Sequence, residues 1–384
     1  MTTLKQKAMR FIILMGFVSL LADITYEGAR SINGPFLAVL GASGTAVGII
    51  VGLGELIGYG IRVLSGLAAD KTRSYWLFTF VGYAINLIAV PLLALAGNWQ
   101  TAALLIVFER FGKGLRTPSR DAMLSFATKR VGRGFGFGLH ESLDQIGAIS
   151  GPLLVSAILF YQHHYAVAFA CLAIPAFAAL SVLTAAKISF PRPQEMEVEE
   201  KKLETGFSKK FWIYVIGTSL VGAGFIDFAL LSFHLQKSAV LSPAWIPLVY
   251  ALAMAVDGIS ALWMGRIFDV KGIATLAAVT IITSLFAPLI LLGGFAAILC
   301  GMVLWGISLG AQESIMRSYV AVLTSPKKRG AAYGILYLGF GLFWFLGSSA
   351  IGFLYDRSLT GAVAFSLAMQ WSGALLFLIC KKMR

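Results

Sequence analysis

Long apolar runs fill the chain from residue 9 to residue 380, with only short polar breaks between them. Runs of about 18 or more apolar residues are long enough to cross a bilayer as helices. The runs are continuous and do not alternate, which indicates helices and not strands. We predict an all-α membrane protein with twelve transmembrane helices, over residues 9–40, 43–69, 75–96, 100–125, 133–160, 164–188, 211–236, 243–268, 273–293, 296–323, 329–356 and 360–380.

The first apolar run is followed by no small-residue cleavage site, so we expect it to stay as a helix and not to be removed as a signal peptide. The chain has 384 residues, of which 58% are hydrophobic and 13% charged. A soluble globular protein has far more charge. The three cysteines lie far apart in apolar runs and suggest neither a disulfide framework nor a zinc site.

The net charge of +13 would suit a nucleic-acid partner, but the positions of Lys and Arg point to another explanation. With the N-terminus inside, 21 of these residues fall on the inner face, whereas only Lys237 and Arg357 fall in outer loops. This bias follows the positive-inside rule. We therefore expect a prokaryotic inner-membrane protein with both termini cytoplasmic and no nucleic-acid partner.

The two halves of the chain share short patterns. Gly-x-x-x-Asp begins at Gly66 and again at Gly265, and Arg-Gly-x-x-aromatic-Gly begins at Arg133 and again at Arg329. The offsets are 199 and 196 residues, and two unrelated pairs at nearly one offset indicate duplication. We predict two pseudo-symmetric six-helix bundles, related as parallel repeats. Their ranges are 1–188 and 211–384, with a polar cytoplasmic linker over 189–210.

At these positions the chain resembles, over its whole length, the major facilitator superfamily of secondary transporters. Gly66, Asp70, Lys71 and Arg73 match the family's loop motif, with Thr72 in place of its second glycine. The resemblance implies that Asp70 lies near the N-terminal end of a second-half helix, where the helix dipole favours a carboxylate. It would latch one conformation there, and Arg73 would complete this gate.

Two further segments match more loosely. Gly265 and Asp269 form the second copy of the loop motif, and Gly66 and Gly265 are expected to let helix backbones approach closely at a crossing. Arg110 with Gly114 resembles the fourth-helix motif, although Lys113 stands where Gln is usual.

The sequence GAISGP, from Gly147 to Pro152, resembles the fifth-helix motif of proton-driven exporters. That motif normally ends in two glycines, where this chain has Val155 and Ser156. Gly147, Gly151 and Pro152 would let the fifth span bend and pack closely, because proline removes one backbone hydrogen bond. The resemblance implies the fold of the superfamily, alternating access, and a central cavity lined by the first span.

The first span also contains charged residues. Asp23, Glu27 and Arg30 lie on one face at spacings of four and three, so either carboxylate can pair with Arg30. At 1.5 Å per residue, Asp23 lies about 20 Å and Glu27 about 25 Å from the inner end of the span. A central charge facing lipid costs at least about 2.5–3.5 kcal/mol, so this face must meet protein or a water-filled cavity.

Other predicted spans carry ionisable residues at comparable depth. The remaining candidates for proton coupling or the substrate cavity are Glu55, Glu109, Arg110, Lys113, His140, Glu141, Asp144, Asp227, Asp257, Glu313 and Arg317. Two interpretations stay open. Pairs such as Glu109 with Lys113 and Glu313 with Arg317 can simply join helices. Carboxylates with no helix partner can instead bind and release a proton, because burial favours the neutral form; these are Asp23, Glu27, Glu55, Glu141 and Asp144.

His140 can relay a proton or can be an ordinary hydrogen-bonded histidine. Arg116, Arg120 and Asp121 lie near the predicted inner end of the fourth span. We expect them to form a cytoplasmic salt-bridge gate; the alternative is that they bind an anionic substrate head. Lys71 of the loop motif is also expected to take part in gating.

We therefore expect a secondary active transporter that exports a small organic or amphiphilic solute by proton antiport. The alternative substrate is a divalent metal or metal complex, held by acidic and His residues of spans one, two and five. An intramembrane metalloenzyme is disfavoured, because Asp144 replaces the second histidine of His-Glu-x-x-His. Two halves with gate motifs disfavour a channel. We expect no catalytic residue and no cofactor. The expected partners are the solute, protons and the bilayer, and the protein is expected to be a monomer.

Overall fold

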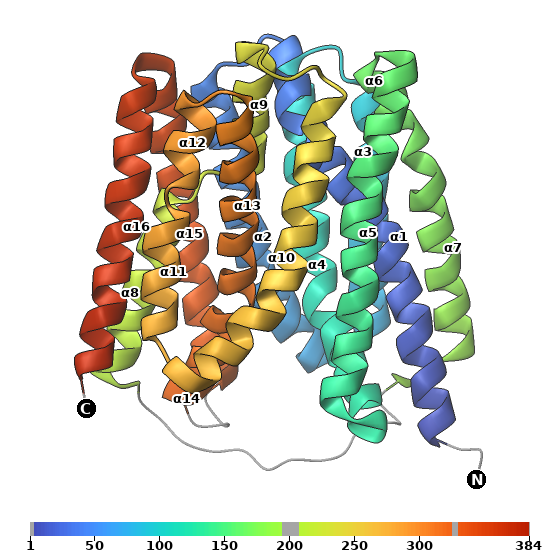
Figure 1. The fold of residues 1–384 in the computed structure, drawn as a ribbon. Coiled ribbons are helices and arrows are strands. Elements are labelled where there is room, and N and C mark those ends of the chain that lie inside the picture. The colour runs from blue at the N-terminus through green and yellow to red at the C-terminus, as the bar shows by residue number, and fades with distance from the viewer. Residues whose placement is uncertain (1–3, 194–206, 325–328, 384) are drawn as a thin grey trace. The chain divides into compact units, whose positions relative to one another are not determined.

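The computed structural model describes residues 4–193, 207–324 and 329–383 (Figure 1). Within these ranges the chain folds into helices and contains no strand, so the all-α prediction is confirmed. The first half has α1 (Leu4–Val39), α2 (Gly44–Thr72), α3 (Tyr75–Leu92) with a 3₁₀ turn (Leu93–Leu95), α4 (Trp99–Val131), α5 (Arg133–Gln162), α6 (Tyr165–Cys171) and α7 (Ala173–Ser189).

The second half has more and shorter helices. They are α8 (Lys209–Gly224), α9 (Phe228–Ser238), α10 (Trp245–Lys271), α11 (Ala274–Thr283), α12 (Phe286–Leu292), α13 (Phe295–Ala311), a π-helical turn (Gln312–Met316), α14 (Arg317–Leu323), α15 (Arg329–Arg357) and α16 (Leu359–Lys382). Each of the twelve predicted spans corresponds to one helix, or to two or three consecutive helical segments, of the described residues. Eleven of these segments are long and apolar enough to cross a membrane.

The remaining span is α4, whose many charged residues set it apart from the other eleven. Its 33 residues give a length of about 50 Å at 1.5 Å per residue. The helix continues to Val131, beyond the predicted end at residue 125. Arg116 therefore lies near the middle of α4 and not near its end. This corrects the position expected for Arg116, Arg120 and Asp121.

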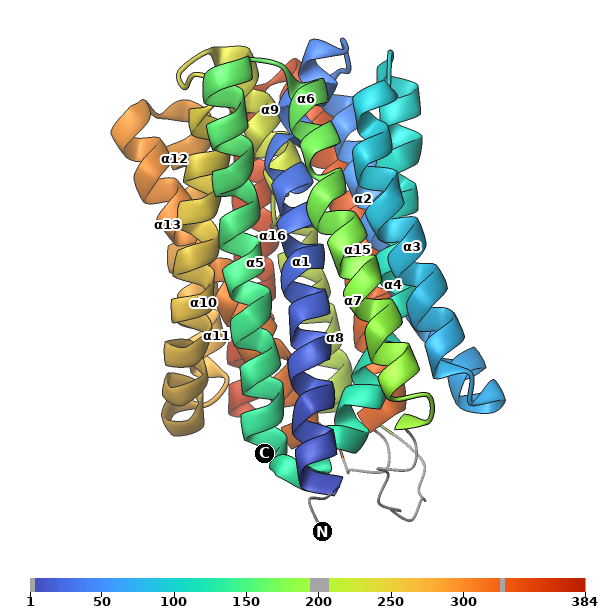
Figure 2. The ribbon, with the colours of Figure 1, turned by 90° about the vertical axis from the view of Figure 1, so that its right-hand side faces the viewer.

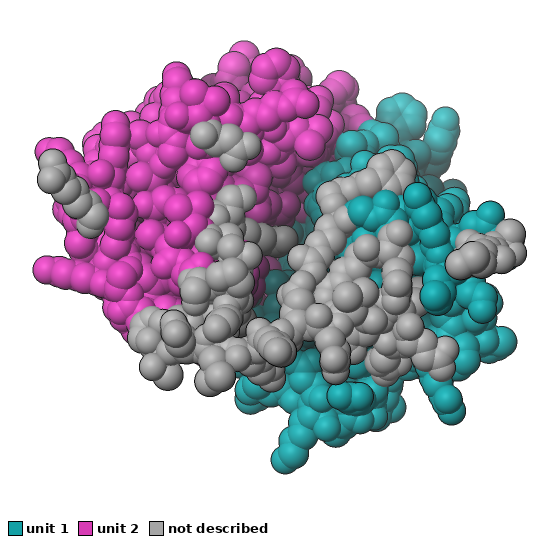
Figure 3. Space-filling model, turned by 90° about the horizontal axis from the view of Figure 1, so that it is seen from below, with its two compact units in different colours: residues 1–31, 57–201 teal, residues 32–56, 202–384 magenta. Residues whose placement is uncertain are grey.

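The chain forms two compact units, shown in different colours in Figure 3. The first contains residues 1–31 and 57–201, and the second contains residues 32–56 and 202–384. The end of α1 and the first half of α2 thus belong to the second unit. Small residues explain this assignment, because Gly34 approaches the backbone of α9 while Gly44, Gly48 and Gly52 approach α15.

In the first unit, α1 lies between α5 and α7 (Figure 2). A Cβ atom on Gly147 of α5 would collide with the carbonyl oxygen of Leu20, and one on Gly151 would collide with that of Ile24. On the other side, α1 packs into a core that also holds residues of α3, α4 and α7. Glycine at 147 and 151 is therefore required for the close approach of α5 to α1.

In the second unit, the predicted seventh span is interrupted between α8 and α9 at residues 225–227. Backbone groups freed inside an apolar span must find other partners. The carbonyl of Gly224 accepts hydrogen bonds from Ser366 Oγ (2.6 Å) and Gln370 Nε2 (3.1 Å). Trp305 Nε1 donates to the carbonyl of Ile226 at 3.0 Å. These side chains stabilise the interruption.

Candidate functional site

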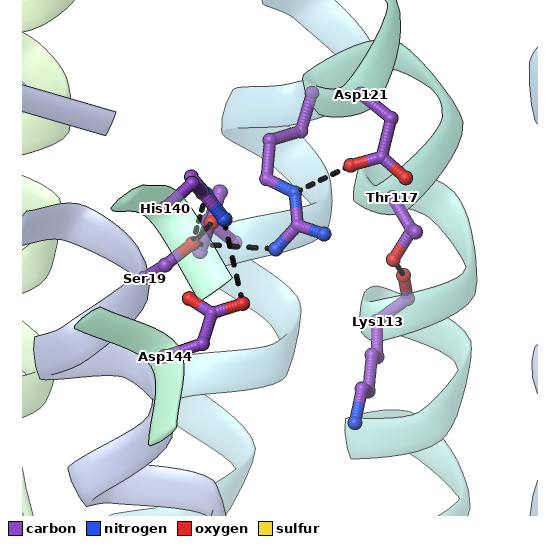
Figure 4. A network of polar contacts seen from close by, with 8 residues as sticks. Ser19, Lys113, Thr117, Asp121, His140 and Asp144 are labelled. Carbon is purple, nitrogen blue, oxygen red and sulfur yellow. Dashed lines mark hydrogen bonds and ion pairs between the residues drawn. The ribbon is translucent and has the colours of Figure 1, made fainter. Parts of the chain in front are cut away.

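A chain of polar contacts centred on His140 crosses three helices of the first unit (Figure 4). His140 Nδ1 lies 3.5 Å from Asp144 Oδ2, and His140 Nε2 lies 3.0 Å from Ser19 Oγ. Arg120 donates to the same Ser19 oxygen at 3.2 Å and to Asp121 Oδ1 at 2.9 Å. An uninterrupted series of polar groups therefore joins a carboxylate on α5 to a carboxylate on α4.

Helix geometry accounts for this arrangement. His140 and Asp144 are one turn apart on α5, so both point toward Ser19 on the adjacent α1. His140 is only 4% exposed, and the Asp144 side chain is 18% exposed. An imidazole between a carboxylate and a hydroxyl can accept a proton on one nitrogen and release it from the other. This geometry suits a proton relay.

A second group of contacts surrounds Tyr26 on α1. Lys113 Nζ lies 3.9 Å from the centroid of the Tyr26 ring, and the Arg116 guanidinium lies 4.1 Å from that of Tyr83. Arg116 is 1% exposed, and its Nε and Nη1 have no hydrogen-bond partner among the described residues. Each of these cations therefore lies over an aromatic ring and makes a cation–π contact.

The charged residues of α1 lie beside this group. Asp23 and Glu27 are 6% and 5% exposed, and both interact electrostatically with Lys113. Glu27 Oε1 also lies 3.8 Å from Arg30 Nη1, one turn further along α1. Asp23 and Glu27 of the first span are therefore buried, as the cost of a charge in lipid requires.

Glu109 makes different contacts from those suggested by its i,i+4 spacing to Lys113. Its carboxylate accepts a 2.6 Å hydrogen bond from Asn86 Nδ2 and lies 3.4 Å from Arg110 Nε. Asn86 Nδ2 also donates to the Glu109 carbonyl at 3.1 Å. The predicted Glu109–Lys113 pair is therefore wrong, because a neighbouring helix supplies a closer partner and the Lys113 ammonium lies over Tyr26.

The other candidate carboxylates have the following positions within their own units. Glu55 belongs to the segment of α2 in the second unit, and Glu141 is exposed on α5. Asp227 caps α9 by accepting a 2.8 Å hydrogen bond from the backbone N–H of Ala229. Asp257 is buried in α10.

The last predicted pair lies at the π-helical turn after α13. Glu313 is exposed in this turn, and the Arg317 side chain lies outside the described residues, as does that of Asp269 in the second loop motif. A π-helical turn inside a span is rare and often marks a functional position.

At the loop motif, Asp70 and Lys71 are exposed near the end of α2, and Asp70 Oδ1 accepts a 3.1 Å hydrogen bond from Tyr75 Oη. Arg73 has φ of +54°, in the left-handed region that favours glycine. The backbone conformation therefore indicates that Arg73, and not Thr72 as predicted, stands where the motif has its second glycine.

The packing reason predicted for the motif glycines is wrong for Gly265, because no described atom lies within 4 Å of a Cβ built there. A Cβ on Gly66 would make ordinary contact with Pro118 at 3.4 Å. The fifth-helix segment differs, since Gly147 and Gly151 touch α1 as described above. Pro152 is buried within α5, which continues through it.

Sequence reasoning missed four neutral residues that shape the site: Ser19, Tyr26, Tyr83 and Asn86. Tyr83 Oη lies 3.4 Å from Ser19 Oγ, close to the Arg120 contact. Ser19 and Tyr26 lie in α1, and Tyr83 and Asn86 lie in α3. Neutral polar residues are common in apolar spans, so only their position opposite the charged faces could have identified them. Among the described residues, no group of three His, Cys, Asp or Glu side chains could hold a metal ion.

Residues 12–348 match the family described as Major Facilitator Superfamily. An uncharacterised protein of Mycobacterium tuberculosis is 40% identical over 371 residues, which cover 94% of this chain and 91% of the relative. The multidrug resistance protein MdtH of Proteus mirabilis is 24% identical over 329 residues, covering 84% and 80%.

Among solved structures, a mutant of the nucleoside transporter NupG has the same fold. Its TM-score is 0.79 at 16% identity, and the match covers 97% of this chain and 100% of that chain. The match of the family over most of the sequence, on a fold of twelve spans, identifies this chain as a membrane transporter that belongs to the Major Facilitator Superfamily.

Proposed function

We propose that this transporter exports a small organic or amphiphilic solute in exchange for protons, and that Asp144 and His140 carry the proton. The observation behind the proposal is the buried contact of His140 with a carboxylate on one side and a hydroxyl on the other. Protonation of Asp144 would weaken its interaction with His140 and, through Ser19, change the surroundings of Arg120. A proton can thereby affect how α1, α4 and α5 pack.

Export is supported by two features. The glycines of the fifth-helix motif pack directly on α1, next to Asp23. A relative at 24% identity is named a multidrug resistance protein. In this proposal the chain lies in the inner membrane as a monomer with both termini cytoplasmic, as the distribution of Lys and Arg favours. The solute binds near the midplane and is exposed to each side in turn.

The Tyr26 group provides the second part of the proposal. Asp23 and Glu27 interact electrostatically with Lys113 of α4, so the charge of a solute and the charge of a proton can compete for interactions with the same residues. A divalent metal finds less support, because the described residues offer no group of three ligands. An organic solute is therefore the better candidate.

The test uses purified protein in proteoliposomes with an imposed pH gradient and an internal pH dye. Organic cations, amphiphilic drugs, anions and divalent metals are screened for a solute-triggered proton flux. We expect Asp144→Asn and His140→Gln to abolish this flux while solute binding remains. Glu141→Gln is the matched control, because Glu141 is an exposed carboxylate on the same helix.

The outcomes separate the parts of the proposal. Solute movement with no proton flux, unchanged in Asp144→Asn, would overturn proton coupling. A flux lost equally in Glu141→Gln would overturn the specific role of the buried pair. Proton flux triggered by metals alone would replace the organic solute with the metal alternative.

A further inference from the structure

A cavity of about 920 Å³ lies in the first unit, between the N-terminal part of α1 and the segment that follows α7. Its volume is within the range of small-molecule sites. Three cationic side chains line it, namely Lys7, Arg10 and Arg192. Among the described lining residues none is acidic, and the others include the apolar Leu14 and Phe190.

The pattern of α1 explains why the cations face this cavity. Leu4, Lys7, Arg10 and Leu14 recur at spacings of three, three and four, which places them on one stripe of the helix. The neighbouring stripe, which includes Phe11, is fully buried in the core of the unit. The cationic stripe is therefore the face of α1 that the protein leaves open.

The opposite wall is held in place by specific contacts. The carbonyl of Phe190, directly after α7, accepts a 2.9 Å hydrogen bond from Trp76 Nε1. The Phe190 ring packs edge-on against Phe11 at 5.4 Å between centroids. Pro191 follows with its restricted backbone. These contacts hold the start of this segment against α1 and α3, while Arg192, two residues further on, is exposed at the edge of the cavity.

We propose that this cavity binds an anionic phospholipid. Lys7, Arg10 and Arg192 hold its phosphate, and an acyl chain follows the apolar side of α1. The charge of the lining fits a phosphodiester. Ile13 and Phe17, 37% and 48% exposed, continue an apolar path along α1 away from the cations. These apolar residues can contact an acyl chain, whereas inorganic phosphate would make no favourable contact with them. With the N-terminus cytoplasmic, the headgroup lies at the inner leaflet.

The experiment compares the full chain in nanodiscs of phosphatidylcholine with and without phosphatidylglycerol. The measurements are thermal unfolding and native mass spectrometry of the released protein. We expect phosphatidylglycerol to raise the unfolding temperature and to stay bound as one retained lipid. Arg10→Gln and Lys7→Gln should each weaken retention several-fold, while Arg10→Lys should preserve it. Lys5→Gln is the matched control, because Lys5 is an exposed cation of α1 that does not line the cavity.

Each result decides the proposal. Equal retention of the two lipids would overturn it, as would an equal loss in Lys5→Gln. Full stabilisation by inorganic phosphate alone would show an anion site without a lipid. The unfolding temperature of each variant in pure phosphatidylcholine shows whether it is folded, and Arg10→Lys tests the charge in a variant expected to fold.

Discussion

Asp356 caps the first turn of α2 by binding Thr45 twice. Its Oδ2 accepts hydrogen bonds from the backbone N–H of Thr45 at 2.7 Å and from the Thr45 hydroxyl at 2.6 Å. Oδ1 accepts from the N–H of Gly44 at 2.9 Å, and Ser43 Oγ accepts from the N–H of Ala46 at 3.1 Å. The first N–H groups of α2, which have no partner inside the helix, are thus satisfied, two of them by a residue 311 or more positions away.

Asp356→Ala should loosen the attachment of residues 32–56 to α15. Loss of a helix cap costs about 0.5–2 kcal/mol, so we expect a lower unfolding temperature in detergent, followed by tryptophan fluorescence. Asp356→Asn keeps one acceptor oxygen and should lose less. Equal stability of wild type and Asp356→Ala would show that solvent replaces this cap.

Close packing of the same segment gives a second prediction. A Cβ on Gly48 would collide with the carbonyl of Ser348 and lie 3.0 Å from the Cα of Gly352. Gly48→Ala should therefore destabilise the protein by about 1–3 kcal/mol. Gly60→Ala, also in α2, meets no described atom within 4 Å and should be neutral or stabilising by up to about 1 kcal/mol. In detergent, the unfolding temperature should fall for Gly48→Ala and should not fall for Gly60→Ala; the same fall in both would contradict the contact.

The positions of the helices can be predicted from the sequence, because a segment that crosses a bilayer must be a long run of apolar residues. The span positions, the His140–Asp144 face and the enclosed face of α1 follow from helical spacing. The interruption at residues 225–227 does not, since an apolar run looks the same whether its backbone is helical or not. Partners such as Ser366 and Trp305 satisfy it from distant parts of the sequence.

Side-chain partners across helices were the weakest part of the prediction. The i,i+4 spacing of Glu109 and Lys113 allows an ion pair, yet Asn86 on another helix takes the carboxylate. Spacing along one helix describes only local neighbours, whereas the bonded partner depends on tertiary packing. The same limit applies to Gly265, whose motif resemblance is not accompanied by a close helix contact among the described residues.

The Asn86–Glu109 bond can be measured by a double-mutant cycle. Hydrogen bonds to a charged group contribute about 1.5–3 kcal/mol, so Asn86→Ala should be strongly destabilising. In the Glu109→Gln background the same change should cost less, with a coupling energy of about 0.5–3 kcal/mol. Unfolding of the four proteins in detergent supplies the cycle, and additive effects would show that the bond contributes nothing specific.

The interruption of the seventh span gives another test. Trp305→Phe removes the donor to the Ile226 carbonyl and leaves a buried acceptor without this partner, at a cost of about 1–3 kcal/mol. Trp371→Phe is the matched change, because Trp371 Nε1 donates at 2.9 Å to Ser284 Oγ while its side chain is 48% exposed. We expect the larger fall in unfolding temperature for Trp305→Phe. The opposite order would mean that another group satisfies Ile226.

The last prediction concerns Ser19, whose hydroxyl contacts His140, Arg120 and Tyr83. If protons pass through this network, Ser19→Ala should slow the solute-triggered proton flux, because one hydrogen bond of about 1.4 kcal/mol in the rate-limiting step corresponds to roughly tenfold. The solute concentration for half-maximal flux should stay unchanged. Ser142→Ala is the control, since Ser142 is exposed and its hydroxyl donates to the carbonyl of Gly138 in its own helix. A wild-type rate in Ser19→Ala would place the proton path on Asp144 without the hydroxyl. An equal loss in both variants would reflect a general effect of polar groups in the spans.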